Sequence, residues 1–148
     1  MKIPVASDHA GYHAKEIVKR LLQEMGHEVV DYGTNSEASV DYPDYSHAVS
    51  KGVRDGEYET GILLCGSGQG VCMTANKYDH VRAALVLSDR SAALSRQHND
   101  ANVLCLAARE MDPETMEETL KGILKAWLET PFEGGRHARR VDKIQQEP

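Results

Sequence analysis

A glycine-rich segment in the middle of the chain carries residues that could do chemistry. It reads Cys65-Gly66-Ser67-Gly68-Gln69-Gly70 and follows an apolar run over 60–65. Backbone N–H groups of such a loop, at the start of a helix, can bind an anion. A thiol in that place ionises more readily than a free one, which makes Cys65 a candidate nucleophile or base. A purely structural turn, and a Cys65 that is simply a small core side chain, are the plainer alternatives.

This loop is not a dinucleotide-binding fingerprint. The position of the third glycine is occupied by Val71. Asp89 lies about twenty residues further on, where a ribose-binding acid would stand, but the loop follows the third expected strand and not the first. We therefore do not expect a nicotinamide cofactor. The remaining cysteines, Cys72 and Cys105, are expected in the core, and three cysteines without a CxxC pair argue against a disulfide framework or a zinc ribbon.

Histidines supply the second group of candidates. His9 and His13 have the spacing of two metal ligands on one helix face, but Gly11 interrupts that helix. A phosphate or hydroxyl contact is therefore favoured for Asp8 and His9, with His13 solvated. His98 follows a helical stretch, where an imidazole can cap the helix or act as a general acid or base. The sequence pattern alone favours the cap.

The third group is the basic end of the chain. Arg136, Arg139 and Arg140 lie within five residues, after two glycines. In a helix, Arg136 and Arg140 share a face and can converge on one phosphate, although a solvated basic tail is the usual outcome. The whole chain has a formal charge of −6. An acidic body with a basic tail favours a small anionic ligand over nucleic acid or a membrane surface.

The elements that position these residues alternate between strand and helix patterns, which predicts an α/β fold with a parallel sheet. Expected strands cover 2–7, 28–32, 60–65, 81–87 and 103–107. We expect the first strand to begin after Pro4, because proline cannot donate to a ladder. Expected helices include 44–55, 69–78, 88–98 and a long last helix opened by Asp112-Pro113 and ended by Pro131. Residues 132–148 form a polar tail in which some helix is expected.

Ordered blocks over nearly the whole chain resemble the type B ribose-5-phosphate isomerases, in the family that also includes the galactose-6-phosphate isomerase subunits. The blocks are Ser7-Asp8-His9-x-Gly11, Asp31-x-Gly33-Thr34, Asp41-Tyr42-Pro43, Cys65-Gly66-Ser67-Gly68-x-Gly70, Ala75-Asn76-Lys77, Ser95 to Asn102, and Glu133-Gly134-Gly135-Arg136-His137 with Arg140. The resemblance implies a Rossmann-like three-layer fold with a five-stranded parallel sheet, in one domain over 1–148 with a basic phosphate-binding tail over 133–148. It also implies no metal or other cofactor, and a homodimer or dimer of dimers with shared active sites.

The same resemblance assigns roles residue by residue. Cys65 would move a proton between C2 and C1 of the sugar, and Ser67 with the loop amides would hold the enediolate oxygens. His98 would assist ring opening, with Asp8 close to the ring oxygen. The substrate-binding residues would be Asp8, His9, Tyr42, Gly66, Ser67, Gly68, Gln69, Gly70, Asn99, Arg109, Arg136 and Arg140. Of these, Asn99 and Arg109 would come from the partner subunit, alongside His98, while His9, Arg136 and Arg140 would bind the phosphate.

Two positions bear on the choice of base. Family members that lack the cysteine use a glutamate six residues after it, where this chain has Val71, so it belongs with the cysteine users. Ser67 stands where many of these have threonine, and it keeps the hydroxyl.

Three alternatives to a ribose-5-phosphate isomerase remain open: an isomerase of a six-carbon phosphate such as allose 6-phosphate, a non-catalytic phosphosugar-binding module, and a redox-sensing thiol protein.

The first residues reach a charged side chain too soon for a signal peptide, and no apolar run is long enough for a membrane span. These features predict a cytoplasmic protein.

Overall fold

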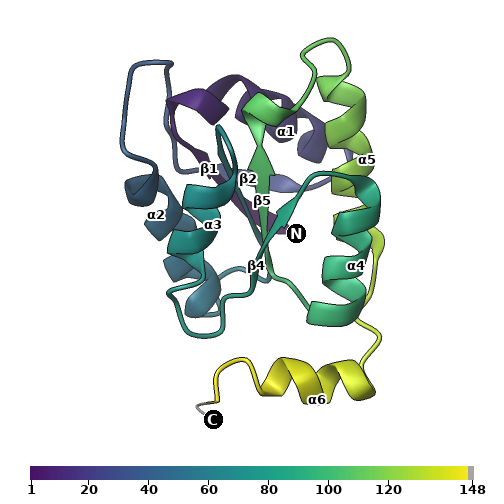
Figure 1. The fold of residues 1–148 in the computed structure, drawn as a ribbon. Helices are drawn as coiled ribbons and strands as arrows, with labels where there is room; N and C mark the ends of the chain where they lie inside the picture. The colour runs from purple at the N-terminus through teal and green to yellow at the C-terminus, as the bar shows by residue number, and fades with distance from the viewer. Residues whose placement is uncertain (147–148) are drawn as a thin grey trace.

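A five-stranded parallel sheet organises the computed structural model, which describes residues 1–146. Its strands are β1 (Lys2–Ser7), β2 (Glu28–Asp31), β3 (Gly61–Cys65), β4 (Ala83–Val86) and β5 (Val103–Ala107). They lie in the order β2-β1-β3-β5-β4 (Figure 1). The predicted α/β fold with five parallel strands is thereby confirmed.

Helices cover both faces of this sheet (Figure 1). One core packs α1 (Tyr12–Glu24), α4 (Asp89–Asn99) and α5 (Met116–Glu129) against one face. A second core packs α2 (Tyr42–Arg54) and α3 (Gln69–Ala75) against the other. All residues of β3 and β5 are buried, which explains why their sequences are apolar without alternation. Two short 3-10 helices, η1 (His9–Gly11) and η2 (Ala108–Glu110), follow β1 and β5.

The last helix, α6 (Arg136–Asp142), lies at one end of the molecule beside the end of α4 (Figure 1). The polar tail therefore contains the helix that was expected there. Among the described residues, no helix has both the length and the apolar composition needed to cross a membrane.

The prediction that the first strand begins after Pro4 is wrong. Pro4 lies inside β1 and is in register with Val30 of β2. In a parallel strand alternate residues bond to opposite neighbours, and Val5 and Ser7 bond to the β2 side. The absent N–H of Pro4 therefore faces β3, whose pairing with β1 begins only at Val5. No ladder hydrogen bond is lost, so the strand tolerates this proline.

Asp112-Pro113 does not open the last long helix as predicted. The Asp112 carbonyl accepts the Thr115 N–H at 3.1 Å, and its carboxylate accepts the Glu114 N–H at 3.0 Å. These bonds close a separate turn, and α5 starts one residue later at Met116. The residues that indicated a helix start form a turn instead, because such turns favour the same residue types.

A partly buried ion pair fixes the segment after β2. The Lys15 side chain has no exposed surface, and its Nζ lies 2.7 Å from Asp31 Oδ1. Burial raises the pKa of Asp31, but hydrogen bonds from Lys15 and Lys19 outweigh it, so the pKa is lowered overall. The same carboxylate accepts the Gly33 N–H at 2.8 Å, at the start of the loop that passes the end of β1 and leads to α2.

We expect Asp31→Asn to destabilise the fold by about 2–3 kcal/mol near neutral pH, because it leaves a buried ammonium without its main partner. The ion pair contributes fully above pH ~4 and is lost as pH falls through the lowered pKa of Asp31. Urea unfolding should therefore show that the wild type loses stability more steeply below pH ~4 than the variant does. The matched control is Asp55→Asn, which breaks an exposed pair with Arg54 and should change little. If the free energy of unfolding depended on pH equally in the wild type and in Asp31→Asn, the stabilising role given to the Lys15–Asp31 ion pair would be wrong.

Candidate active site

A cavity of about 550 Å³ opens at the carboxyl ends of the strands. In the sheet, β2 lies on one side of β1 and β3 lies on the other side. The direction in which successive strands are added therefore reverses between β1 and β3. Open α/β sheets bind ligands at such a switch point. The lining residues are Asp8, His9, Ala10, Tyr42, Cys65, Gly66, Ser67, Gly70, Met73, Arg109 and Glu110.

Cys65 is the last residue of β3 and only 4 % exposed, at the floor of the cavity. The loop after it is closely packed. Gly68 has a φ of 73°, and a Cβ there would meet Leu85 at 2.5 Å and the backbone of Leu106 at 3.1 Å. Only glycine fits this turn, and the loop residues Gly66, Ser67 and Gly70 line the cavity together with Cys65.

Asp8 and His9 stand on the β1 side of the cavity. Asp8 is 7 % exposed, and its Oδ1 accepts the Gly11 N–H at 3.1 Å. His9 Nδ1 accepts the Val40 N–H at 3.2 Å. A neutral His9 ring must then carry its proton on Nε2, which leaves an N–H donor for a ligand. His13 is exposed on α1, away from the cavity lining, as expected for a solvated side chain.

Arg109 and Tyr42 complete the cavity wall. The Arg109 N–H donates to the Gly66 carbonyl at 2.9 Å, which ties η2 to the glycine loop. Arg109 therefore lies in the cavity of its own chain, and the expectation that it would come from the partner subunit is corrected. The Tyr42 ring packs against Gly70, where a Cβ would meet it at 2.4 Å.

Three cavity residues had no predicted role: Ala10, Met73 and Glu110. Glu110 directly follows Arg109 in η2. Met73 stands three residues after Gly70 in α3 and is 64 % exposed. Helical spacing from Gly70 could have indicated Met73. Glu110 stands at the end of the fifth predicted strand, where ligands are expected to bind, but no pattern there assigns it a role.

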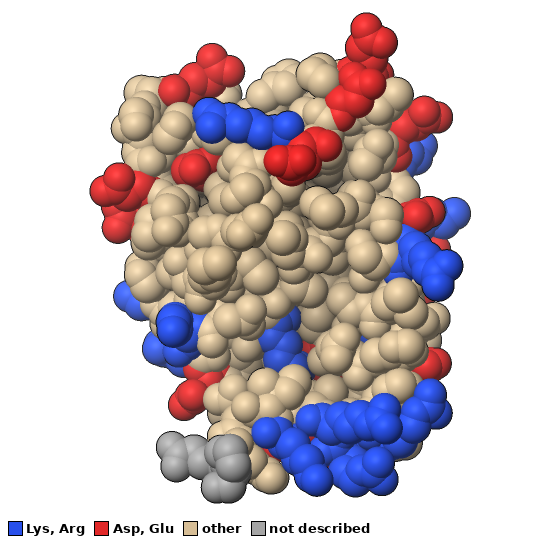
Figure 2. All heavy atoms as spheres, viewed as in Figure 1, with Lys and Arg blue, Asp and Glu red and all other residues tan. Residues whose placement is uncertain are grey.

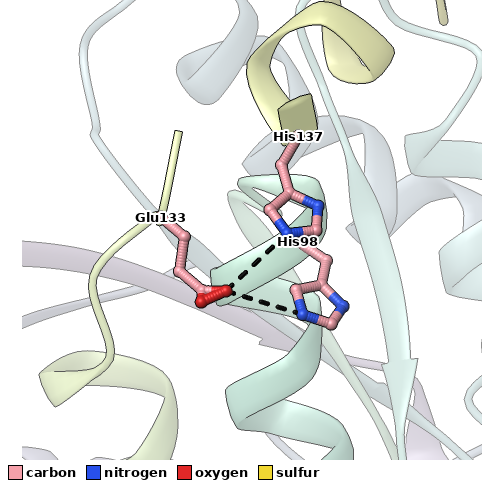
Figure 3. Close-up of side chains that lie close together, drawn as sticks. All are labelled: His98, Glu133 and His137. Carbon is pink, nitrogen blue, oxygen red and sulfur yellow. Dashed lines mark ion pairs between the residues drawn. The ribbon is translucent and has the colours of Figure 1, made fainter. Parts of the chain in front are cut away.

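His98 lies elsewhere, in a second cluster with Glu133 and His137 (Figure 3). The His98 and His137 rings are stacked, with centroids 4.3 Å apart. Glu133 Oε1 is 3.6 Å from His98 Nε2 and 3.7 Å from His137 Nε2. Burial lowers the pKa of His137, and the nearby Arg136 lowers it further. No role had been predicted for Glu133 or His137, although both stand in a motif that carried the resemblance.

Asn99, Arg136 and Arg140 also lie away from the cavity, as parts of α4 and α6 at the opposite end of the molecule (Figure 1). Asn99 lines a different hollow, together with Ile144 and Gln145. In one chain, Arg136 and Arg140 therefore cannot bind a phosphate together with His9, which corrects the single-chain form of that expectation. They can meet His9 only if a second chain supplies them.

Basic side chains gather over α6. Arg136, Arg139, Arg140 and Lys143 are all exposed, and Figure 2 shows blue atoms concentrated at this end of the molecule. Acidic residues predominate near the cavity end in the same view. The charge separation expected from the sequence is thus present in the fold.

A parallel α/β sheet with a thiol, a carboxylate and a glycine loop at its switch point is the arrangement of α/β proteins that bind a small ligand there. The chain belongs to the ribose/galactose isomerase family, whose model matches residues 3–144. A probable ribose-5-phosphate isomerase B of Mycoplasma genitalium is 48% identical over 142 residues, 95% of this chain and 91% of that one.

Solved structures agree with this family. A ribose 5-phosphate isomerase of Thermotoga maritima superimposes with a TM-score of 0.91 at 48% identity, covering 97% of this chain and 96% of the other. The ribose-5-phosphate isomerase B of Mycoplasma genitalium, solved with bound ribulose-5-phosphate, gives a TM-score of 0.90 at 46% identity, covering 97% and 93%. The resemblance stated from the sequence is confirmed, and the chain is an isomerase.

Proposed function

We propose that the protein interconverts D-ribose 5-phosphate and D-ribulose 5-phosphate, with Cys65 as the base. The observation that carries the proposal is the cavity that gathers Cys65, Ser67 and Asp8 in a chain whose relatives bear this activity in their names. A volume of about 550 Å³ accommodates a five-carbon phosphate.

The proposed reaction starts with ring opening. The sugar is mainly a closed furanose, so a group must protonate the ring oxygen while the C1 hydroxyl loses its proton. Asp8 lies in the cavity and would stand near the ring oxygen, while His98 of the partner subunit would supply the proton shuttle. The product is the open-chain aldehyde.

Isomerisation then follows at C2 and C1. The Cys65 thiolate removes the proton from C2, and the electron pair moves onto the aldehyde oxygen to form an enediolate. The Ser67 hydroxyl and the amides of the 66–70 loop stabilise the negative oxygens. The thiol returns its proton to C1 while the proton of the C2 hydroxyl passes to the C1 oxygen, which gives the ketose without any net oxidation.

Phosphate binding requires two chains in this proposal. His9 offers an Nε2–H donor at the cavity, because Val40 occupies its Nδ1. Arg136 and Arg140 stand four residues apart on the exposed face of α6, a spacing that suits one phosphate. The second chain would bring these arginines, with His98 and Asn99, over the cavity.

The surface around the edge strand supports self-association. Met73, Leu85, Leu87 and Leu94 are apolar and exposed on α3, on β4, after β4 and on α4. The middle of this face carries few charged side chains (Figure 2). We infer that a second copy covers it in a homodimer, since apolar clusters of this kind mark interaction sites.

The test is conversion of ribose 5-phosphate to ribulose 5-phosphate by purified protein in excess EDTA. Turnover supports the proposal. Without it, turnover of allose 6-phosphate would identify the six-carbon alternative, and phosphosugar binding without any turnover would identify a binding module. Non-phosphorylated ribose should react far more slowly, because it lacks the group that orients the substrate.

Arg140→Ala is expected to raise the KM for ribose 5-phosphate about tenfold, with a smaller effect on kcat, because it removes a phosphate contact remote from the reacting carbons. Arg139→Ala is the matched control, since it removes an equally exposed guanidinium from the same helix. Steady-state kinetics with both variants decide the matter. Equal effects of the two substitutions would assign the arginines only a general electrostatic role.

A further inference from the structure

The cluster of His98, Glu133 and His137 has the composition of a metal site (Figure 3). One ligand atom from each side chain lies within 4.8 Å of the other two. The two His Nε2 to Glu133 Oε1 distances are 3.6 and 3.7 Å. A tetrahedral zinc ion with bonds of about 2.0–2.1 Å separates its ligand atoms by about 3.4 Å, so these gaps exceed the ideal by only a few tenths.

The backbone holds the three residues together without any ion. The Glu133 N–H donates to the Gln97 carbonyl at 3.1 Å, which fixes it beside the residue that precedes His98. The His137 N–H donates to the Gly134 carbonyl at 3.0 Å and starts α6. The backbone positions of the three residues are thus already fixed, which lowers the ordering cost of binding.

His137 provides a second, independent observation. Its side chain is 8% exposed, and its Nε2 is buried without a hydrogen-bond partner among the described residues. Buried polar atoms are nearly always paired, so an unpaired nitrogen calls for a ligand. This nitrogen faces the Glu133 carboxylate and His98 (Figure 3).

The arrangement of the His98 and His137 rings favours a weak, reversible metal site over a structural one. The rings of His98 and His137 are nearly parallel, 10° apart, so both lone pairs cannot point at one ion. His98 is 42% exposed and Glu133 is 47% exposed, so these two side chains can turn while His137 stays fixed. That movement, and the positive charge of the adjacent Arg136, weaken binding relative to a structural zinc site. The exposed side leaves room for water as a fourth ligand.

We propose that His98, Glu133 and His137 bind Zn²⁺ reversibly, with a water molecule in the fourth position. Two imidazoles and one carboxylate are a ligand set that zinc accepts in sites with an open position. Binding stands on the geometry alone. A second consequence rests on the proposed function: zinc would engage His98 and so inhibit the isomerase.

Calorimetric titration of the full chain with Zn²⁺ tests the binding. We expect one ion per chain, and His137→Ala and Glu133→Ala should each lower the affinity at least about tenfold. Glu133 is half-exposed, so Glu133→Ala keeps the test decisive even if His137→Ala disturbs folding. The matched controls are Glu129→Ala, on the exposed side of α5, and His27→Ala, which lies beside the N-terminal amine.

The competing zinc site is the Cys65 cavity, whose lining also includes His9 and Asp8. Cys65→Ala should therefore keep the high-affinity ion, and Co²⁺ bound in its place should show no thiolate-to-metal charge-transfer band. Loss of binding in Cys65→Ala, or equal affinity in wild type, Glu133→Ala and His137→Ala, would overturn the proposal.

Inhibition is measured separately on the dimeric enzyme. Zn²⁺ should lower turnover in the wild type and in Glu129→Ala at the concentrations that saturate the site, and EDTA should restore it. Glu133→Ala should need at least about tenfold more zinc for the same loss. Binding without inhibition would leave the metal site standing and refute the role given to His98. If the protein shows no turnover, the binding experiment still decides the site.

Discussion

Alanine at position 65 is expected to lower kcat for ribose 5-phosphate roughly 1,000-fold while the substrate still binds. General bases contribute about 10²–10⁴-fold to proton transfer, and no other thiol lines the cavity wall formed by the described residues. In the proposed mechanism substrate affinity would rest mainly on the phosphate contacts, so isothermal titration should give nearly the wild-type dissociation constant. Stopped-flow or discontinuous detection of the ketose then reports the loss of turnover.

The matched control is Cys72→Ala, which removes a half-buried thiol from α3 outside the cavity lining. Its Sγ donates to the Ala83 carbonyl at 3.5 Å, so a small loss of stability is expected with kcat almost unchanged. Turnover by Cys65→Ala within about tenfold of the wild type would remove the thiol from the mechanism. Cys65→Ser should also be slow, because a hydroxyl ionises far less readily than a thiol and supplies almost no anionic base near neutral pH.

Patterns confined to one element predicted the elements of this fold. The run from Thr60 to Cys65 is apolar without alternation, and this is the pattern of a strand covered on both faces, as β3 is. The predictions made from Pro4 and Asp112 were wrong because the structure around each of these residues depends on neighbouring segments. The side that Pro4 presents to β3 is set by where that pairing begins, and the turn at Asp112 competes with a helix that has the same signals.

In the candidate site, too, the sequence predicts features set by single elements but not those that depend on neighbouring segments. Cys65 ends β3, and Asp8 and Arg109 follow the ends of β1 and β5, so their convergence at one edge of the sheet could be predicted from strand order alone. Strand order does not predict whether a given residue belongs to the cavity of its own chain or to that of a partner subunit. Arg109 stays in its own cavity because η2 turns back onto Gly66, and Glu133 reaches His98 through the path of the 130–135 segment. Neither path leaves a periodic signal in the sequence.

Mixing two inactive variants is expected to restore activity if the active site is shared between subunits. Cys65 ends β3 and His98 stands in the last turn of α4, at opposite ends of the folded molecule, so the proposed reaction needs Cys65 of one copy and His98 of the other. Cys65→Ala and His98→Asn homodimers each lack one of the two groups in every site. In a mixed dimer, one site combines the intact Cys65 of one chain with the intact His98 of the other, and the second site lacks both.

Equal amounts of the two variants, unfolded together and refolded, should give half mixed dimers with one working site each. The expected recovery is about a quarter of wild-type turnover, from two proteins that are each nearly inactive. Refolding either variant alone is the control, and size-exclusion chromatography verifies that dimers have formed. If both groups acted within one chain, every site in the mixture would stay defective and no activity would return. Recovery near a quarter would therefore assign Cys65 and His98 to different subunits of one active site.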